Sequence, residues 1–273
     1  MSAPTLDDLE FVRELAVRAG ELVMGYYGTD IEVADKGGEP VTAADNASND
    51  LIVAALRERY PDDALLSEET PVTDDSWSRA ERCWIVDPLD GTSDFVKGRI
   101  GFCVMIGLSV NGRPTLGVVH VPKAGRSFMG LVGTGAWEER DGQRTELSPS
   151  TRALSSELRV IASIAHRDAA LEATLEAIAP AETFSVGSVG LKVGKICADE
   201  ADLYTAPTAR ISLWDTAAPE AILHAAGGRF LNMDGDPLVY TGPLLTHPRG
   251  LLATNGACAG DVVSRLKGRL PDF

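Results

Sequence analysis

The sequence has few cysteines and no long apolar run, and each shortage excludes a class of protein. The cysteines are Cys83, Cys103, Cys197 and Cys258. No two of them form a Cys-x-x-Cys pair, so we expect no zinc site, and their scatter predicts reduced, mostly buried thiols in a cytoplasmic protein. No apolar run approaches about 18 residues, which predicts no membrane span. The first residues lack a basic region followed by an apolar stretch, so we expect no signal peptide.

Basic residues are also scarce: 25 lysines and arginines stand against 40 aspartates and glutamates, for a formal net charge of −15. Such a surface disfavours non-specific binding of nucleic acid polymers and docking on anionic membranes. A small anionic substrate stays compatible, because bound cations can reverse the field locally. The 273 residues, 44% of them hydrophobic, can form a large core in one domain or in two halves. Monomer and homodimer both remain open.

Apolar spacing predicts a chain of mixed helices and strands without internal repeats. Helical periodicity marks residues 6–27 and 43–60. The polar, Gly-containing residues 32–40 between them are expected to form a mobile loop. The clearest hairpin turns at Asn111-Gly112. The strands expected in this part are 64–67, 83–86, 102–110, 115–121, 127–131 and a pair about Asp141-Gly142.

A Ser-rich segment with a proline, residues 147–157, is the expected boundary between two halves, 1–150 and 151–273. After it, strands and helices alternate, which together with the first half predicts an α/β (α+β) fold. The strands expected in the second half are 160–163, 202–204 and 251–254, and the helices are 168–178, 189–198, 215–226 and 259–267.

Residues 84–95, Trp-Ile-Val-Asp-Pro-Leu-Asp-Gly-Thr-Ser-Asp-Phe, carry the strongest functional signal. Apolar residues deliver the chain to Asp87 as a strand, and Pro88 is expected to end the ladder pairing. Asp90 and Gly91 form a turn, and Thr92 opens a helix. Two carboxylates three positions apart thus lie beside backbone amides that can hold an anion. Hard divalent cations prefer such oxygen ligands, so the run predicts metal-assisted chemistry on a phosphate.

The spacing of these carboxylates excludes two other readings. Phosphatases with a nucleophilic aspartate use Asp-x-Asp-x-Thr, with the carboxylates two positions apart, whereas Asp87 and Asp90 are three apart. A calcium-binding loop is excluded on the same ground. A non-enzymatic module that binds metal or phosphate remains an alternative, and a phosphate-release assay with and without Mg²⁺ separates it from an enzyme.

Three further carboxylates have both a functional and an ordinary interpretation. Glu68 follows a short apolar strand and is either a ligand or part of a solvated acidic loop. Asp215 opens the helix at 215–226, where it is either a ligand or an N-cap with Pro219 in the first turn. Asp45 lies three residues after Thr42, a spacing that fits a capping box.

Four segments in this order resemble the signatures of one family. They are Val-Thr-Ala-Ala-Asp at 41–45, Ser-Glu-Glu at 67–69, Asp-Pro-Leu-Asp-Gly-Thr at 87–92 and Trp-Asp-Thr-Ala-Ala at 214–218. Together they are similar to the lithium-sensitive, Mg²⁺-dependent phosphatases related to inositol monophosphatase, over roughly residues 8 to 255. The resemblance implies a layered α-β-α-β-α sandwich and a phosphomonoester hydrolase that uses two or three Mg²⁺ ions on a small phosphorylated substrate.

The resemblance also implies roles for individual residues. It assigns a first metal site to Glu68, Asp87 and the Leu89 carbonyl, and a second to Asp87, Asp90 and Asp215. Thr92 and Asp45 match the pair that orients and activates the attacking water. The amides of Gly91 and Thr92, with Ser93 beside them, match the residues that hold the phosphate.

Within the family, the stretches at 214–228 and 186–192 look most like 3′(2′),5′-bisphosphate nucleotidases. That likeness implies removal of the 3′-phosphate of adenosine 3′,5′-bisphosphate. It assigns substrate contacts to His166, Ser188 and Lys192, with Lys192 holding the second phosphate. His166 as a loop histidine and Lys192 as a solvated helix residue are the alternatives. Thr208 replaces the glutamate that holds inositol hydroxyls in inositol monophosphatases, which makes inositol phosphate or another small alcohol phosphate the second choice of substrate.

Overall fold

The computed structural model describes residues 3–30, 32–36, 39–163 and 168–269. Its helices fall close to the ranges that the apolar periodicity predicts. The α-helices are α1 (Leu6–Tyr26), α2 (Ala43–Arg59), α3 (Thr92–Val96), α4 (Ala169–Ile178), α5 (Val189–Cys197), α6 (Leu213–Ala225) and α7 (Ala259–Leu266). Short 3₁₀ turns lie at Ser76–Arg79, Pro122–Ala124 and Ser155–Glu157.

The larger sheet has the order β3-β4-β5-β6-β7-β8-β9. Its neighbouring strands are antiparallel except β3 and β4, which are parallel. The expected hairpin at Asn111-Gly112 joins β5 to β6, with Val110 opposite Arg113. The strands are β3 (Ala64–Ser67), β4 (Arg82–Asp90), β5 (Cys103–Val110), β6 (Arg113–Val121), β7 (Arg126–Leu131), β8 (Gly135–Arg140) and β9 (Gln143–Glu146).

The smaller sheet has the order β11-β10-β12-β14-β13 and mixes parallel with antiparallel pairs. Its strands are β10 (Arg159–Ile161), β11 (Glu182–Phe184), β12 (Leu203–Ala206), β13 (Arg229–Leu231) and β14 (Leu251–Thr254). The sequence did not predict β11 or β13, because three residues are too few to show a period of two.

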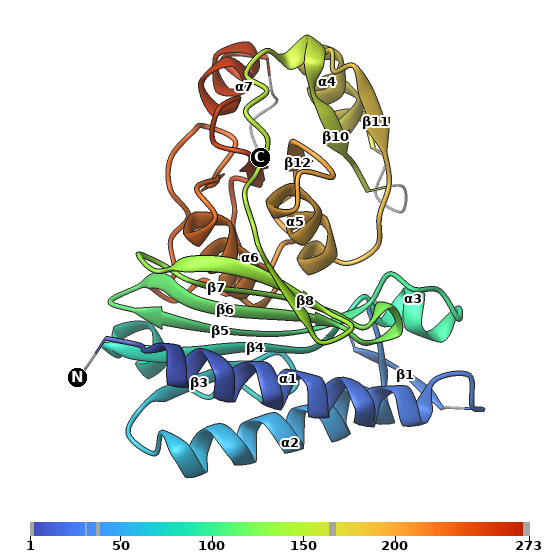
Figure 1. The fold of residues 1–273 in the computed structure, drawn as a ribbon, viewed down its shortest axis with the longest axis vertical. Helices are drawn as coiled ribbons and strands as arrows, with labels where there is room; N and C mark the ends of the chain where they lie inside the picture. The colour runs from blue at the N-terminus through green and yellow to red at the C-terminus, as the bar shows by residue number, and fades with distance from the viewer. Residues whose placement is uncertain (1–2, 31, 37–38, 164–167, 270–273) are drawn as a thin grey trace.

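Helices and sheets alternate in layers (Figure 1). Helices α1 and α2 cover one face of the larger sheet, and α5 and α6 cover the other. The smaller sheet follows, and α4 and α7 close its outer face. This order confirms the expected α-β-α-β-α sandwich.

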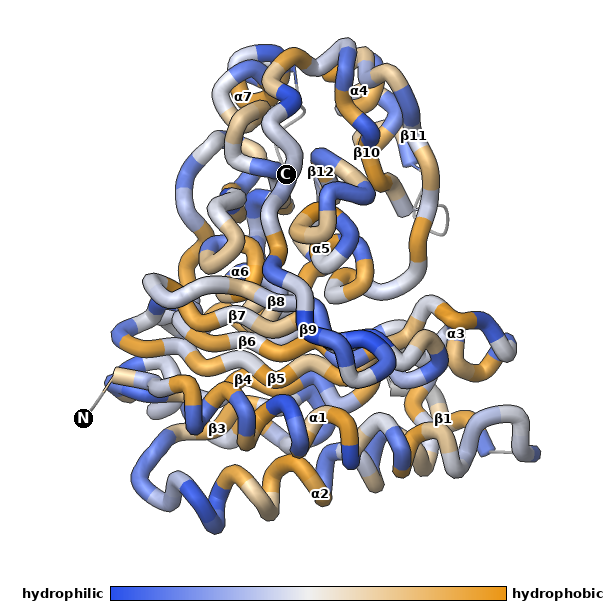
Figure 2. Tube along the Cα trace, viewed as in Figure 1, coloured by the Kyte–Doolittle hydropathy of each residue, from blue (hydrophilic) through white to orange (hydrophobic). Residues whose placement is uncertain are grey.

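Strand β4 shows why the larger sheet needs helices on both faces. Trp84 and Val86 pack toward α1 and α2, whereas Cys83 and Ile85 pack toward α5 and α6. Because successive side chains point to opposite faces, a strand covered on both sides has a continuous apolar sequence. Figure 2 shows the same pattern as hydrophobic residues concentrated along the central strands.

Helix α6 lies directly on the backbone of the larger sheet. A Cβ added to Gly117 would stand 2.2 Å from the carbonyl oxygen of Ala218, and one added to Gly107 would stand 2.7 Å from the Ala218 nitrogen. The two glycines therefore permit a close approach that any side chain would prevent. This contact carries a helix of the second half onto the sheet of the first, so the two halves share one hydrophobic core.

The segment at 32–40 is a correction to the sequence analysis. It was expected to be a loop, but strands β1 (Val33–Lys36) and β2 (Glu39–Thr42) form an antiparallel pair with Val33 opposite Thr42. Each strand has four residues, and no alternation of apolar and polar residues marks them. Periodicity cannot detect strands of this kind.

Across the ranges that the structure describes, no helix combines the length and the apolar character needed to cross a membrane. This agrees with the absence of a long apolar run in the sequence.

Candidate active site

The carboxyl end of β4 forms the centre of the candidate site. Asp87 is 1% exposed, and its carboxylate accepts a hydrogen bond of 3.0 Å from the Leu89 amide. The sequence analysis expected Pro88 to end the pairing, which is only partly right. The ladder is irregular after Asp87 and resumes with Asp90 opposite Cys103. Pro88 thus lies in a bulge, where the missing N–H costs no ladder bond and the chain is re-aimed.

A left-handed glycine connects this strand to α3. Gly91 has φ +90° and is the N-cap residue, so α3 begins at Thr92 as predicted. A Cβ at Gly91 would stand 2.7 Å from the Gly101 carbonyl oxygen, which adds a steric reason for glycine. The hydroxyl of Ser93 is exposed and accepts a bond from Lys97 (3.2 Å).

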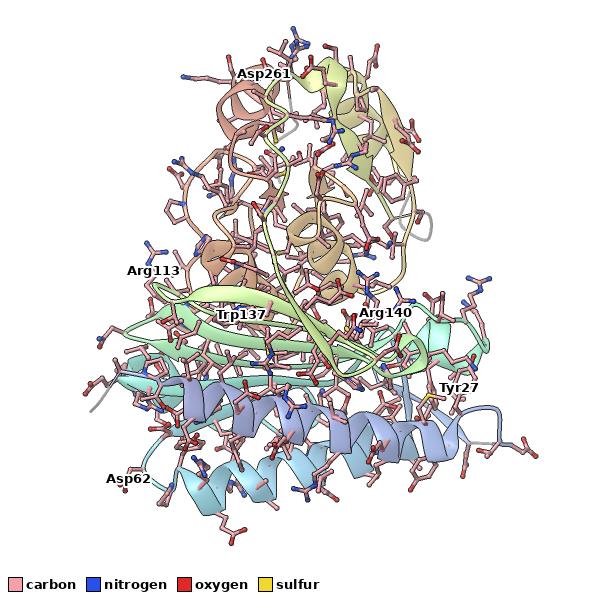
Figure 3. The ribbon with its side chains drawn as sticks, viewed as in Figure 1. Tyr27, Asp62, Arg113, Trp137, Arg140 and Asp261 are labelled. Carbon is pink, nitrogen blue, oxygen red and sulfur yellow. The ribbon has the colours of Figure 1, made fainter. Side chains whose placement is uncertain are left out.

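Aromatic packing fixes α3 to the end of α1. Tyr27, the C-cap residue of α1, lies beside α3 (Figure 3) and its hydroxyl donates to the Gly98 carbonyl at 2.5 Å. Its ring packs edge-on against Phe95 and tilted against Phe102. The short α3, which could not be stable alone, is therefore held by tertiary contacts.

The start of α2 brings Asp45 to Thr92. The predicted capping box is present: the Asp45 Oδ2 atom accepts from the Thr42 amide (2.8 Å) and from the Thr42 hydroxyl (2.6 Å). The other oxygen, Oδ1, accepts from the Thr92 hydroxyl at 2.9 Å. Burial raises the pKa of Asp45 above its usual range, while the bonds from Thr42 and Thr92 act against that rise. Asp45 therefore both caps a helix and fixes Thr92.

Asp215 is likewise part of a capping box, one turn inside its helix. The N-cap of α6 is Ser212, and the Ser212 amide donates to Asp215 Oδ2 at 2.7 Å. The helix therefore begins at Leu213, earlier than the sequence predicted. Pro219 is consequently an interior residue of α6 and not part of its first turn, which corrects the sequence analysis.

Three carboxylates from three parts of the chain act on the buried Asp87. Burial, and then the charges of Glu68, Asp90 and Asp215, raise the pKa of Asp87 well above its usual range. A fully buried carboxylate that faces three others is costly unless a cation joins them. The donor set, all hard oxygen, fits Mg²⁺. Among the described residues, no group of three histidine, cysteine, aspartate or glutamate side chains is close enough together to hold a metal ion.

Helix α5 covers the Asp90 side of the cluster. The Gly190 amide donates to Asp90 Oδ2 at 3.3 Å, which joins positions 100 residues apart. Ser188 is the N-cap of α5, and its hydroxyl accepts from the Leu191 amide. Lys192 lies on the next turn and is buried. The structure thus brings Ser188 and Lys192 to the site, while His166 lies outside the described residues.

Two supporting residues on α2 were missed from the sequence. The Ser48 hydroxyl donates to the Pro88 carbonyl at 2.8 Å, and Asn49 accepts from the Ser67 hydroxyl at 2.7 Å. They hold the ends of β4 and β3, next to Asp87 and Glu68. Their signal was present, because they follow Asp45 by three and four positions and so share its face of the helix.

The comparisons with known proteins cover nearly the whole chain. The model of the inositol monophosphatase family matches residues 6–267. The chain is 39% identical over 238 residues to the 3′(2′),5′-bisphosphate nucleotidase CysQ of Escherichia coli K12, covering 85% of this chain and 94% of that one. It is 32% identical over 264 residues to the histidinol-phosphatase of Mycobacterium tuberculosis, covering 95% and 98%.

Solved structures agree with the family model. The inositol monophosphatase of Thermotoga maritima superposes with a TM-score of 0.81 at 26% identity, covering 95% of this chain and 96% of that one. That of Anabaena gives 0.76 at 26% identity, covering 97% and 96%. With its four motifs meeting around Asp87, this chain belongs to the inositol monophosphatase family, a family of phosphatases.

Proposed function

We propose that this phosphatase removes the 3′-phosphate of adenosine 3′,5′-bisphosphate, with water as the nucleophile and two or three Mg²⁺ ions as cofactors. The hydrolytic part of the proposal is supported by the buried Asp87, on which the charges of three further carboxylates act, and by the hydrogen bond between Thr92 and Asp45. The three carboxylates are Glu68, Asp90 and Asp215. The similarity to the CysQ nucleotidase over 85% of the chain supports the choice of substrate.

The carboxylates would hold the ions in two groups. Glu68, Asp87 and the Leu89 carbonyl make one group, and Asp87, Asp90 and Asp215 make the other. Magnesium bound there would lower the pKa of a coordinated water and stabilise negative charge on the departing oxygen. The family is generally Mg²⁺-dependent, which agrees with this donor set.

The protein's own groups position the water and the phosphate. The Thr92 hydroxyl, bonded to Asp45, orients the attacking water and passes its proton toward that carboxylate. Burial, which raises the pKa of Asp45, makes it a better proton acceptor than an exposed aspartate. The amides of Gly91 and Thr92, with Ser93, bind the phosphoryl oxygens. The left-handed conformation of Gly91 supports this role, since it turns the chain sharply at the strand end.

Three residues are proposed to contact the rest of the substrate. They are His166, Ser188 and Lys192, on the likeness to bisphosphate nucleotidases. The buried, free cysteines support the proposal of a reduced, cytoplasmic setting. We propose a monomer or a homodimer that acts on small phosphorylated molecules and not on nucleic acid or membranes, since the net charge is −15.

A substrate panel tests the proposal. Phosphate release is measured with and without Mg²⁺ on adenosine 3′,5′-bisphosphate, inositol 1-phosphate, fructose 1,6-bisphosphate, histidinol phosphate and NADP. We expect the bisphosphate nucleotide to give the highest kcat/KM, and EDTA to abolish release. Absence of release from every member of the panel would favour the non-catalytic binding module.

A small alcohol phosphate is the second candidate substrate, favoured by the 32% identity to a histidinol-phosphatase over 95% of the chain. Thr208 stands where inositol monophosphatases have a glutamate, and its hydroxyl accepts a bond from the Arg210 amide. No carboxylate is thus available at this position to hold an alcohol hydroxyl. A preference for histidinol phosphate or inositol 1-phosphate in the panel would replace the nucleotide as substrate.

A further inference from the structure

A set of buried polar side chains runs along helix α6 and takes no part in the proposed reaction. Thr216 and Glu220 are four residues apart on α6, so they share one face of the helix, and both are 0% exposed. The hydroxyl of Tyr240 lies 2.9 Å from Thr216 Oγ1 and 2.7 Å from Glu220 Oε2. A phenol can donate one hydrogen bond and accept another, so Tyr240 can bridge the two side chains.

His247 extends this set to the beginning of the helix. Its Nε2 atom lies 2.8 Å from Thr216 Oγ1. Its ring lies edge-on to the ring of Tyr240, with the ring centres 5.3 Å apart. The four buried residues Thr216, Glu220, Tyr240 and His247 are called the α6 clamp here. The clamp joins two successive turns of α6 to the segment that follows β13.

That segment is also bonded to the backbone next to Asp215. The Leu213 amide donates to the Leu245 carbonyl at 2.9 Å, and Ser212 pairs with Thr246 as an isolated bridge. Ser212 is the residue whose amide donates to Asp215 Oδ2. The backbone that fixes the Asp215 carboxylate is therefore itself held by this segment.

Pro219 explains why α6 needs the clamp. Proline has no amide hydrogen, so Pro219 cannot donate to the carbonyl of Asp215, four residues earlier, and its ring crowds that carbonyl. Helix α6 nevertheless continues through Pro219 without a break. The Tyr240 hydroxyl contacts one side chain before the proline and one after it. It thus connects the turn that carries Asp215 to the rest of the helix, where a backbone bond is missing.

We propose that Tyr240 and His247 are positioning residues for Asp215. By holding Thr216, they fix the first turn of α6, and with it the Asp215 carboxylate, before a metal ion binds. A ligand that is already held in place loses less conformational freedom on binding, so the clamp raises the affinity for Mg²⁺ from a distance. The inference rests on the role of Asp215 as a metal ligand, given under the proposed function.

Tyr240→Phe tests the bridge, because it removes the hydroxyl and keeps the ring. Calorimetric titration with Mg²⁺ alone should show about tenfold weaker binding, the effect of losing one hydrogen-bonded support. In the metal-free variant, hydrogen exchange should be faster at the amides of the first turn of α6. The kcat at saturating Mg²⁺ should stay within about twofold of the wild type, because no group that touches the substrate is lost.

Tyr60→Phe is the matched control. It also removes a buried phenol hydroxyl that donates to a helix-capping aspartate, Asp8, at 2.6 Å, but at the start of α1. It should leave Mg²⁺ affinity and the exchange of the α6 amides unchanged. Unchanged Mg²⁺ affinity in Tyr240→Phe as well would overturn the proposal.

A double variant separates positioning from stability. Among the described residues, Glu220 Oε1 has no hydrogen-bond partner. Tyr240→Phe therefore leaves the whole buried carboxyl group unpaired and also destabilises the fold. Adding Glu220→Met removes that group and should restore the lost thermal stability, while Mg²⁺ binding stays weak because the bridge across Pro219 is still missing. Recovery of Mg²⁺ affinity together with stability would make Tyr240 a structural residue and overturn the proposal.

Thr216 offers a test that does not depend on Tyr240→Phe folding. Thr216→Val keeps the shape of the side chain and removes its contacts with Tyr240 and His247, so Mg²⁺ binding should weaken. Thr216→Ser keeps the hydroxyl and should bind Mg²⁺ as the wild type does. Equal affinities in the two variants would overturn the proposal.

The same titration distinguishes this inference from the proposed function. If Asp215→Asn binds Mg²⁺ as tightly as the wild type, Asp215 is not a ligand, and the inference fails with that assignment. If the wild type binds Mg²⁺ and Tyr240→Phe weakens the binding, but the bisphosphate is not hydrolysed, the proposed substrate is wrong and the inference stands.

Discussion

Helices α1 and α2 begin with the same local structure, yet only one beginning belongs to the site. Each helix begins with a capping box, Thr5 with Asp8 in α1 and Thr42 with Asp45 in α2. In both boxes the threonine amide donates a hydrogen bond of 2.8 Å to the aspartate. In both, the second carboxylate oxygen accepts from another hydroxyl. For Asp8 the donor is Tyr60, at 2.6 Å.

The two aspartates nevertheless titrate in opposite directions. At Asp8, burial acts to raise the pKa, but the hydrogen bonds from Tyr60 and Thr5 outweigh burial and lower it. Burial dominates at Asp45 and raises its pKa. The same local hydrogen bonds therefore produce two different carboxylates. Asp8 caps a helix, whereas Asp45 is also a candidate proton acceptor. A third capping box, Ser212 with Asp215, resembles the Thr42–Asp45 box in lying at the candidate site, because the charge of Asp215 acts on Asp87.

The largest effect is expected where a capping carboxylate is also a proposed metal ligand. Asp215→Asn keeps an oxygen that can accept from the Ser212 amide, but it removes the charge. Mg²⁺-dependent phosphate release should fall about 1,000-fold or more, because loss of a ligand costs several kcal/mol of transition-state stabilisation. Circular dichroism should show an unchanged fold. Retention of a tenth of wild-type activity would remove Asp215 from the ligand set, and Asp87→Asn should be at least as severe.

A smaller effect is expected at the second box. Asp45→Asn keeps the cap of α2 but cannot accept a proton, so kcat should fall about 100-fold. Thr92→Ala should give a similar loss, with Mg²⁺ affinity nearly unchanged. Because the two side chains are bonded, the double variant should be little slower than either single one. A shifted Mg²⁺ midpoint with kcat preserved at saturation would show that Thr92 has another task.

The interior of α6 offers a pH test of burial. Burial raises the pKa of Glu220 to about 8, opposed by the hydrogen bond from Tyr240 and by the charge of Arg113. The imidazole of His224, whose own pKa burial lowers, lies 3.8 Å from the Glu220 carboxylate. Between pH 4.5 and about 8, Glu220 keeps its proton in the folded protein but loses it in the unfolded chain. The free energy of unfolding therefore falls as pH rises through this range. Urea unfolding at several pH values measures this slope.

Glu220→Gln is the matched variant for that measurement, since it cannot ionise. It should flatten the pH dependence and stabilise the protein by about 1–3 kcal/mol near pH 8. An equal slope in the wild type and the variant would mean that Glu220 ionises in the folded protein as it does in water.

The smallest effect is expected at the first box. Asp8→Ala removes the cap of α1 and should cost about 1 kcal/mol of stability. Phosphate release should stay within about twofold of the wild type, because surface changes rarely reach a distant site. A large loss of kcat in Asp8→Ala would show that local geometry, and not tertiary position, distinguishes the boxes.

Much of the fold was predictable because its elements are long or have clear end signals. Helices α1 and α2, the hairpin at Asn111-Gly112 and the start of α3 at Thr92 all follow from periodicity and turn residues. The pair of strands at 33–42 was missed, because four-residue strands without alternation resemble a loop. The bulge at Pro88 was read as a strand end, since a proline signals a lost donor but not a resumed ladder.

The sequence by itself determined the local chemistry of this protein. It determined the capping box at Thr42, the turn at Gly91, and the kinds of oxygen ligand available. Each of these depends on bonds between residues a few positions apart, which spacing alone can reveal.

Only the tertiary structure decided which carboxylates meet and what charge they face. The contact of Asp90 with the first turn of α5 joins residues 100 positions apart, and the burial of Lys192 depends on the same packing. Desolvation and Coulomb interactions depend on distances in space and not along the chain. For that reason the raised pKa of Asp45 and the burial of Lys192 could be found only in the fold.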